Sequence, residues 1–166
     1  MKNSTKRLAY LSLTVAVAMI LSYVESLIPP LVAVPGVKIG LSNIATVFAL
    51  YTLGIPCAIA VSLVRVLLSA LLFGNVASLI YSAFGAAAAL TFMCLLRRTH
   101  LFSPVGVSIS GGIAHNAGQV LAACLVLESS AISVYLAPLV VSGTVAGVLV
   151  GIAAGILISR IGSILG

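Results

Sequence analysis

The polar residues with the greatest chemical potential in this chain lie within long apolar stretches. Arg65 lies near the middle of one such stretch, about ten residues from either end. A charge at the centre of a membrane helix costs about 2.5 to 3.5 kcal/mol on insertion scales, so such a residue needs a function or a partner. Two interpretations of Arg65 stay open: a counter-charge for an anionic or carbonyl-rich ligand, or a structural ion pair with Glu25 or Glu128.

A second polar group lies together in the apolar segment from residue 104 to 127. His115 and Gln119 are four residues apart and therefore share one helix face, with Asn116 about 100° around the axis. We expect these three side chains to form a polar wall that faces the inside of the protein; hydrogen bonding between helices is the alternative. We do not expect a metal site, because the only other histidine, His100, lies in a predicted loop and the chain has no Asp.

Further polar residues gather at the predicted outer ends of the helices. Combined with Arg65 and the polar wall, they predict a pocket beneath the proline-rich segment of residues 29–36, which would act as a lid. In the empty state we expect an ion pair between Glu25 and Arg65 that ligand binding opens. The predicted ligand-binding residues are Arg65, Lys38, Asn43, Glu25, Asn75, His115, Asn116 and Gln119.

Several catalytic signatures are missing from the sequence. It has no GxxxxGK[ST] motif for ATP, and no Asp with which to hold Mg²⁺ on a diphosphate. The three cysteines have no CxxC spacing, and we interpret them as buried apolar residues. We therefore expect no enzymatic activity from this polypeptide alone, no cofactor or metal in it, and a use of ATP only through a partner.

The elements that position these residues are predicted to be membrane helices. Of the 166 residues, 62% are hydrophobic and 6% are charged, which excludes a water-soluble globular protein. We predict an all-α integral membrane protein, with one transmembrane domain over residues 1–166. Its six predicted spans are residues 8–28, 39–53, 55–73, 76–96, 104–127 and 132–159.

The net charge of +6 is explained by membrane topology rather than by nucleic-acid binding. When the loops are sorted alternately to two sides, most cations fall on one side, which the positive-inside rule places in the cytoplasm. Both termini are therefore predicted to be cytoplasmic. The cations on that side are Lys2, Lys6, Arg7, Arg97, Arg98 and Arg160.

Small residues recur at every fourth position in three predicted helices, a spacing that lets helix backbones approach closely in a membrane. In residues 104–127 and 132–159 we expect these stripes to serve internal packing. The stripe in residues 8–28 has a second interpretation, contact with another protein. The stripes comprise Gly106, Ser110, Ala114, Gly118 and Ala122; Gly143, Gly147, Gly151 and Gly155; and Thr14 with Ala18 beside Ser12 with Ala16.

Four stretches carry a resemblance to a known group. They are ESLIPP at residues 25–30, PGVKIGLSNI at 35–44, FGN at 73–75 and GGIAHNAGQ at 111–119. With them the chain resembles small six-helix bacterial membrane proteins of the Gx transporter superfamily, which includes the substrate-binding S components of energy-coupling-factor (ECF) transporters. Within it, the chain is most similar to the branch labelled heptaprenyl diphosphate synthase component I.

The resemblance implies a multi-pass S component in the bacterial cytoplasmic membrane. Such a protein captures a small nutrient or a redox or isoprenoid precursor from outside, then docks on a membrane coupling subunit driven by ATPases. The docking surface would be Ser12 with Ala16, or Thr14 with Ala18. The alternative is an accessory subunit of prenyl diphosphate or quinone metabolism, or of flavin-linked electron transfer.

Overall fold

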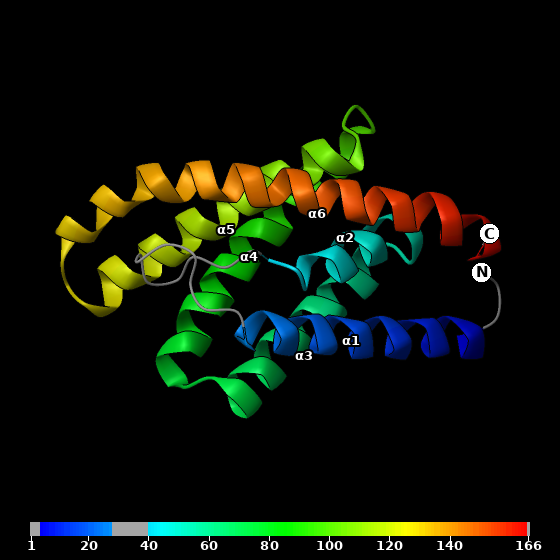
Figure 1. Ribbon diagram of the computed structural model, residues 1–166, viewed down its shortest axis with the longest axis horizontal. Coiled ribbons are helices and arrows are strands. Elements are labelled where there is room, and N and C mark those ends of the chain that lie inside the picture. The colour runs from blue at the N-terminus through cyan, green and yellow to red at the C-terminus, as the bar shows by residue number, and fades with distance from the viewer. Residues whose placement is uncertain (1–3, 28–39, 166) are drawn as a thin grey trace.

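All regular secondary structure in the described part of the chain is helical. The computed structural model describes residues 4–27 and 40–165, and it contains no strand in those ranges (Figure 1). The elements are α1 (Ser4–Leu27), α2 (Asn43–Thr52), α3 (Ile55–Phe73), α4 (Val76–Thr99), α5 (Pro104–Val126), the 3₁₀ helix η1 (Ser130–Tyr135) and α6 (Leu136–Leu165).

Local chemistry explains where the helices begin. Gly54 separates α2 from α3 with a φ of 91°, which is strained for other residues, and a proline follows in the first turn of α3. Asn75 caps α4 by accepting a hydrogen bond from the Ser78 backbone N–H at 2.8 Å. Ser103 caps α5 in the same way, with Pro104 as its first residue.

In residues 4–27 and 40–165, five helices are long and apolar enough to cross a membrane, which indicates a multi-pass membrane protein. The candidate spans coincide with α1, α3, α4, α5 and the η1–α6 segment. Within its described residues 40–53, the remaining predicted span contains the ten-residue helix α2. At 1.5 Å per residue α2 is about 15 Å long, half of a hydrocarbon core of about 30 Å.

The arrangement in Figure 1 explains the short length of α2. The start of α1 and the end of α6 lie at the same end of the long axis, and α2 begins near the middle and runs toward that end. A hydrogen bond from Arg7 of α1 to the backbone oxygen of Leu53, at 3.3 Å, joins the two helices there. The first residues of α2 therefore lie deep inside the bundle.

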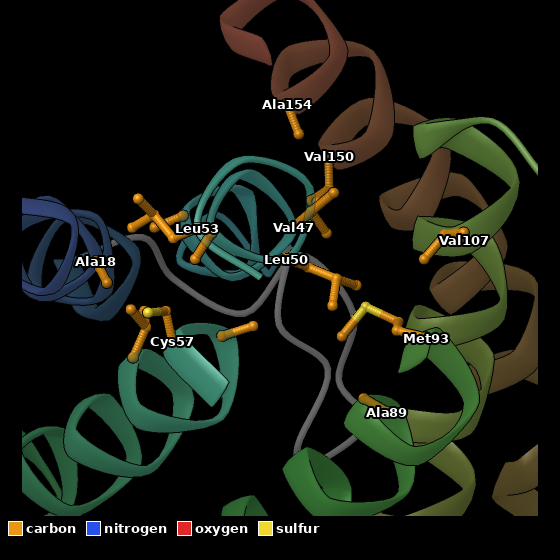
Figure 2. Close-up of a cluster of buried hydrophobic side chains, with 14 residues drawn as sticks. Ala18, Val47, Leu50, Leu53, Cys57, Ala89, Met93, Val107, Val150 and Ala154 are labelled. Carbon is orange, nitrogen blue, oxygen red and sulfur yellow. The ribbon is translucent and has the colours of Figure 1, made fainter. Parts of the chain in front are cut away.

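Core residues of the neighbouring helices pack against α2. Figure 2 shows Val47, Leu50 and Leu53 of α2 pointing toward apolar side chains of the other helices, such as Met93 of α4 and Val150 of α6. The outer surface is apolar instead of polar, with large exposed residues along α1, α3, α4, α5 and α6. Such a surface requires lipid around it.

Glycines bring α5 and α6 into backbone contact. A Cβ added at Gly112 would lie 2.3 Å from the backbone oxygen of Gly143, and one at Gly147 would lie 2.6 Å from the Cα of Ile109. The predicted internal packing of the α6 stripe is confirmed, except at Gly155, which has nothing within 4 Å. Gly118 of the predicted α5 stripe packs on α4, not on α6. Because α5 contacts both α4 and α6, it carries small residues on two faces.

Candidate functional site

A small cavity lies inside the bundle, where α2 begins. Its volume is about 40 Å³. Because a water needs roughly 10 to 15 Å³ on this measure, the cavity has room for about three waters. All six α-helices contribute to its walls, and the glycines at the α5–α6 contact form part of them. Its polar lining consists of Glu25, Ser42, Asn43, Arg65, Ser108, His115 and Asn116.

The turn before α2 forms one wall of this cavity. Gly40 adopts a φ of 76°, and its carbonyl oxygen accepts a hydrogen bond of 2.9 Å from the Asn43 N–H. This turn directs the start of α2, with its partial positive charge, toward the cavity. A helix that begins inside a bundle leaves its first backbone N–H groups available to line a cavity enclosed by protein.

The two charged side chains that line the cavity form hydrogen bonds to opposite ends of the turn before α2. Glu25 of α1 accepts a hydrogen bond from the Gly40 N–H. Arg65 of α3 donates from Nη1 to the Ser42 hydroxyl at 2.8 Å, whereas its Nε is buried without a hydrogen-bond partner in the described chain.

The predicted ion pair between Glu25 and Arg65 is wrong as a direct contact. In residues 4–27 and 40–165 the two side chains bind the turn instead of each other, because the turn offers each of them a polar group. Glu128 is not the partner of Arg65 either. It is exposed between α5 and η1, with a φ of 50°.

The predicted polar wall of α5 is split between two helix interfaces. Asn116 lines the cavity and donates from Nδ2 to the backbone oxygen of Leu139 at 2.6 Å. His115 also lines the cavity, and it packs with Gln119 against Gly85 of α4, where an added Cβ would lie 2.9 Å from each side chain. Gln119 is buried there, outside the cavity lining.

Ser108 is a polar residue of this site that sequence reasoning missed. Its side chain is 4% exposed, and its hydroxyl has no hydrogen-bond partner in the described part of the chain. The signal was available, because Ser108 precedes Gly111 by three residues and His115 by seven, the spacing of one helix face.

Asn75, another predicted ligand residue, does not line the cavity either. Asn75 is exposed and serves as the α4 cap described above. Lys38 lies outside the described residues. The structure thus gathers five of the eight predicted ligand residues: Glu25, Asn43, Arg65, His115 and Asn116.

The residues predicted to contact a partner divide into two pairs. Ser12 and Ala16 are exposed on α1. Thr14 and Ala18 are buried, and Figure 2 shows Ala18 beside Cys57 of α3. Because α3 covers this face of α1, a docking surface on Thr14 and Ala18 does not fit the fold.

A comparison with known protein families finds a match for this chain. The family model described as heptaprenyl diphosphate synthase component I matches residues 14–157. The chain belongs to this family. The match includes every residue that lines the cavity. No curated protein and no solved structure matches the chain.

The family name implies a partner, since a component I is one subunit of a synthase. The cavity of this component I protein contains one carboxylate and one imidazole among its lining side chains. Within the described residues, no three His, Cys, Asp or Glu side chains come together in a way that could hold a metal ion. The chemistry that the cavity offers is hydrogen bonding and charge pairing.

Proposed function

We propose that this component I protein is a membrane-embedded subunit that binds a small polar molecule in the cavity at the start of α2 and acts with separate partner proteins. The observation that carries the proposal is the meeting of Arg65, Glu25 and the first turn of α2 in one cavity. Burying these groups in an apolar bundle is costly. A bound ligand that pairs with them would offset that cost.

The contacts define the chemistry of the ligand. An anionic or strongly accepting group would bind the unpartnered Nε of Arg65 and the positive start of α2. The Ser108 hydroxyl and the amides of Asn43 and Asn116 supply further hydrogen bonds. Glu25 would accept from a donor on the same ligand. At about 40 Å³ the cavity is far smaller than small-molecule pockets of about 300 to 1,000 Å³, so binding must separate its walls.

The role we favour for this binding is uptake, as in the S components that the sequence resembles. In that role the chain would span the bacterial cytoplasmic membrane six times, counting residues 39–53, with both termini in the cytoplasm. It would capture a nutrient or a redox or isoprenoid precursor from outside. The exposed pair Ser12 and Ala16 offers a face of small side chains to a coupling subunit, whose ATPases would supply the energy.

A second candidate function is favoured by the family match itself. As a component I, the chain would be a non-catalytic membrane subunit of a prenyl diphosphate synthase or of quinone metabolism. The absence of Asp from the whole sequence supports a non-catalytic role, because the Mg²⁺–diphosphate chemistry would then have to come from the partner.

One experiment separates the two functions. The full chain is purified from its native membrane in mild detergent, and both the small molecules and the proteins that accompany it are identified by mass spectrometry. Uptake predicts that the chain alone, after all partners are washed away, still holds a small polar molecule. A chain that retains no such molecule and co-purifies with a soluble prenyl synthase subunit would establish the accessory role and refute uptake.

A further inference from the structure

A second and much larger space lies between α3 and α4. It has a volume of about 580 Å³ and is open along the side of the bundle. Its α3 wall consists mainly of large apolar residues, including Ile59, Leu63 and Leu67, all of them exposed. We call this space the α3–α4 groove. It shares no lining residue with the cavity at the start of α2.

The groove is built for an apolar chain. The hydroxyl group of Thr91, one of its few polar groups, already donates to the backbone oxygen of Ala87 at 2.8 Å. Ala83 and Ala87 of α4 deepen the groove, because their side chains are short. The α3 wall extends from residue 55 to residue 67, about 18 Å of helix. That length is close to one leaflet of a hydrocarbon core of about 30 Å.

A single cation marks one end of the groove. Arg98, in the last turn of α4, is exposed and belongs to the groove lining. Its neighbour Arg97 is engaged elsewhere: the guanidinium lies 4.4 Å from the centre of the Tyr51 ring, and Nη1 is 3.0 Å from Nδ1 of His100. Arg98 is therefore the guanidinium that the groove presents to an anion at the level of the lipid headgroups.

We propose that the α3–α4 groove is a specific site for an anionic phospholipid, with one acyl chain along the groove and the phosphate on Arg98. A guanidinium binds phosphate with two parallel hydrogen bonds, and basic pockets between membrane helices select anionic headgroups in this way. A partner helix fits less well. Close helix packing in a membrane favours small residues on both walls, as at the Gly112–Gly143 contact, whereas the α3 wall is formed mainly by leucine and isoleucine.

The test is native mass spectrometry of the full chain released from nanodiscs that contain phosphatidylglycerol and phosphatidylcholine in equal amounts. The wild type is expected to retain phosphatidylglycerol over phosphatidylcholine by roughly tenfold, the worth of one charge-assisted hydrogen bond. Arg98→Gln should lose this preference. Lys6→Gln, which removes an exposed cation from α1, is the matched control and should keep it.

A second pair of variants tests the groove itself. Ala87→Phe fills the groove and should release both lipids, whereas Ala77→Phe, on an exposed part of α4 outside the groove, should leave retention unchanged. Size-exclusion profiles and melting temperatures show whether both variants fold. A folded Ala87→Phe or Arg98→Gln variant with wild-type lipid retention would overturn the proposal.

Two further measurements distinguish a phospholipid from other molecules that could occupy the groove. A photoactivatable side chain placed at position 87 in living cells should form an adduct with phospholipid, and an adduct with a protein would overturn the proposal in favour of a partner helix. Farnesyl diphosphate added to the nanodiscs should not displace phosphatidylglycerol at equal concentration. If it does, the groove is a site for isoprenoid diphosphates and the phospholipid assignment is wrong.

Discussion

Replacing Arg65 by Ala tests the cavity at the start of α2. The change removes the hydrogen bond from Nη1 to Ser42 and the unpartnered Nε. If the ligand binds Nε, the variant loses at least one charge-assisted hydrogen bond of about 1.5 to 3 kcal/mol. The dissociation constant should then rise by a factor of ten or more, because 1.4 kcal/mol corresponds to about tenfold.

The same substitution should have a different effect on stability. It leaves the Ser42 hydroxyl without its donor, a cost of about 1 kcal/mol. It also removes a central charge that costs about 2.5 to 3.5 kcal/mol in a membrane helix. In the absence of ligand, Arg65→Ala should therefore melt no lower than the wild type.

The assay for both effects is a ligand titration followed by the melting temperature, carried out on the chain in detergent with the molecule that co-purifies. Arg65→Lys should rescue binding only in part, because Lys lacks the planar fork of the guanidinium. Lys6→Ala is the control for a general loss of positive charge. A variant that binds as tightly as the wild type but melts at a much lower temperature would show that Arg65 is a structural residue.

Three other predictions follow from the fold and the topology. Gly143→Ala should destabilise the bundle by about 1 to 3 kcal/mol through overpacking against α5, whereas Gly155→Ala, with open space around it, should not; equal unfolding curves would refute the packing. Ala16→Leu should abolish co-purification of a coupling subunit and leave a folded monomer, so an unfolded variant would mean that this residue serves internal packing. With six spans and cytoplasmic termini, an impermeant thiol reagent on intact cells should label Ser130→Cys and not Ser103→Cys, and the reverse result would refute that topology.

Much of the fold could be predicted from residues that act locally. Gly54 with Pro56, Asn75, and Ser103 with Pro104 fix helix boundaries through backbone geometry and capping. Apolar length and composition identified the spanning helices, because a bilayer demands both. The short α2 was less predictable, since the helix begins inside the protein, where the surrounding helices and not the lipid set its limit.

The part of the candidate site that depends on residue type alone could be predicted from the sequence. Arg65 and the polar residues of α5 are costly in an apolar chain, so their inward placement follows from energetics. Which groups they contact depends on tertiary structure. The Gly40–Asn43 turn separates Glu25 from Arg65, and nothing in the spacing of those two residues indicates it. Asn75 was predicted to bind the ligand, whereas in the structure its side chain caps α4.

We propose that this chain, by itself, binds a small polar molecule in the cavity at the start of α2. The most direct test is the amount of that molecule per chain in protein purified from its native membrane and stripped of partners, compared with the same amount for Ser108→Leu. Leucine at this position would fill the cavity and remove a hydroxyl group from its wall. Binding in this cavity predicts about one molecule per wild-type chain and about a tenth or less in the folded variant, which corresponds to a loss of at least 1.4 kcal/mol of binding free energy. An equal amount in both proteins, or no small molecule in either, would contradict it.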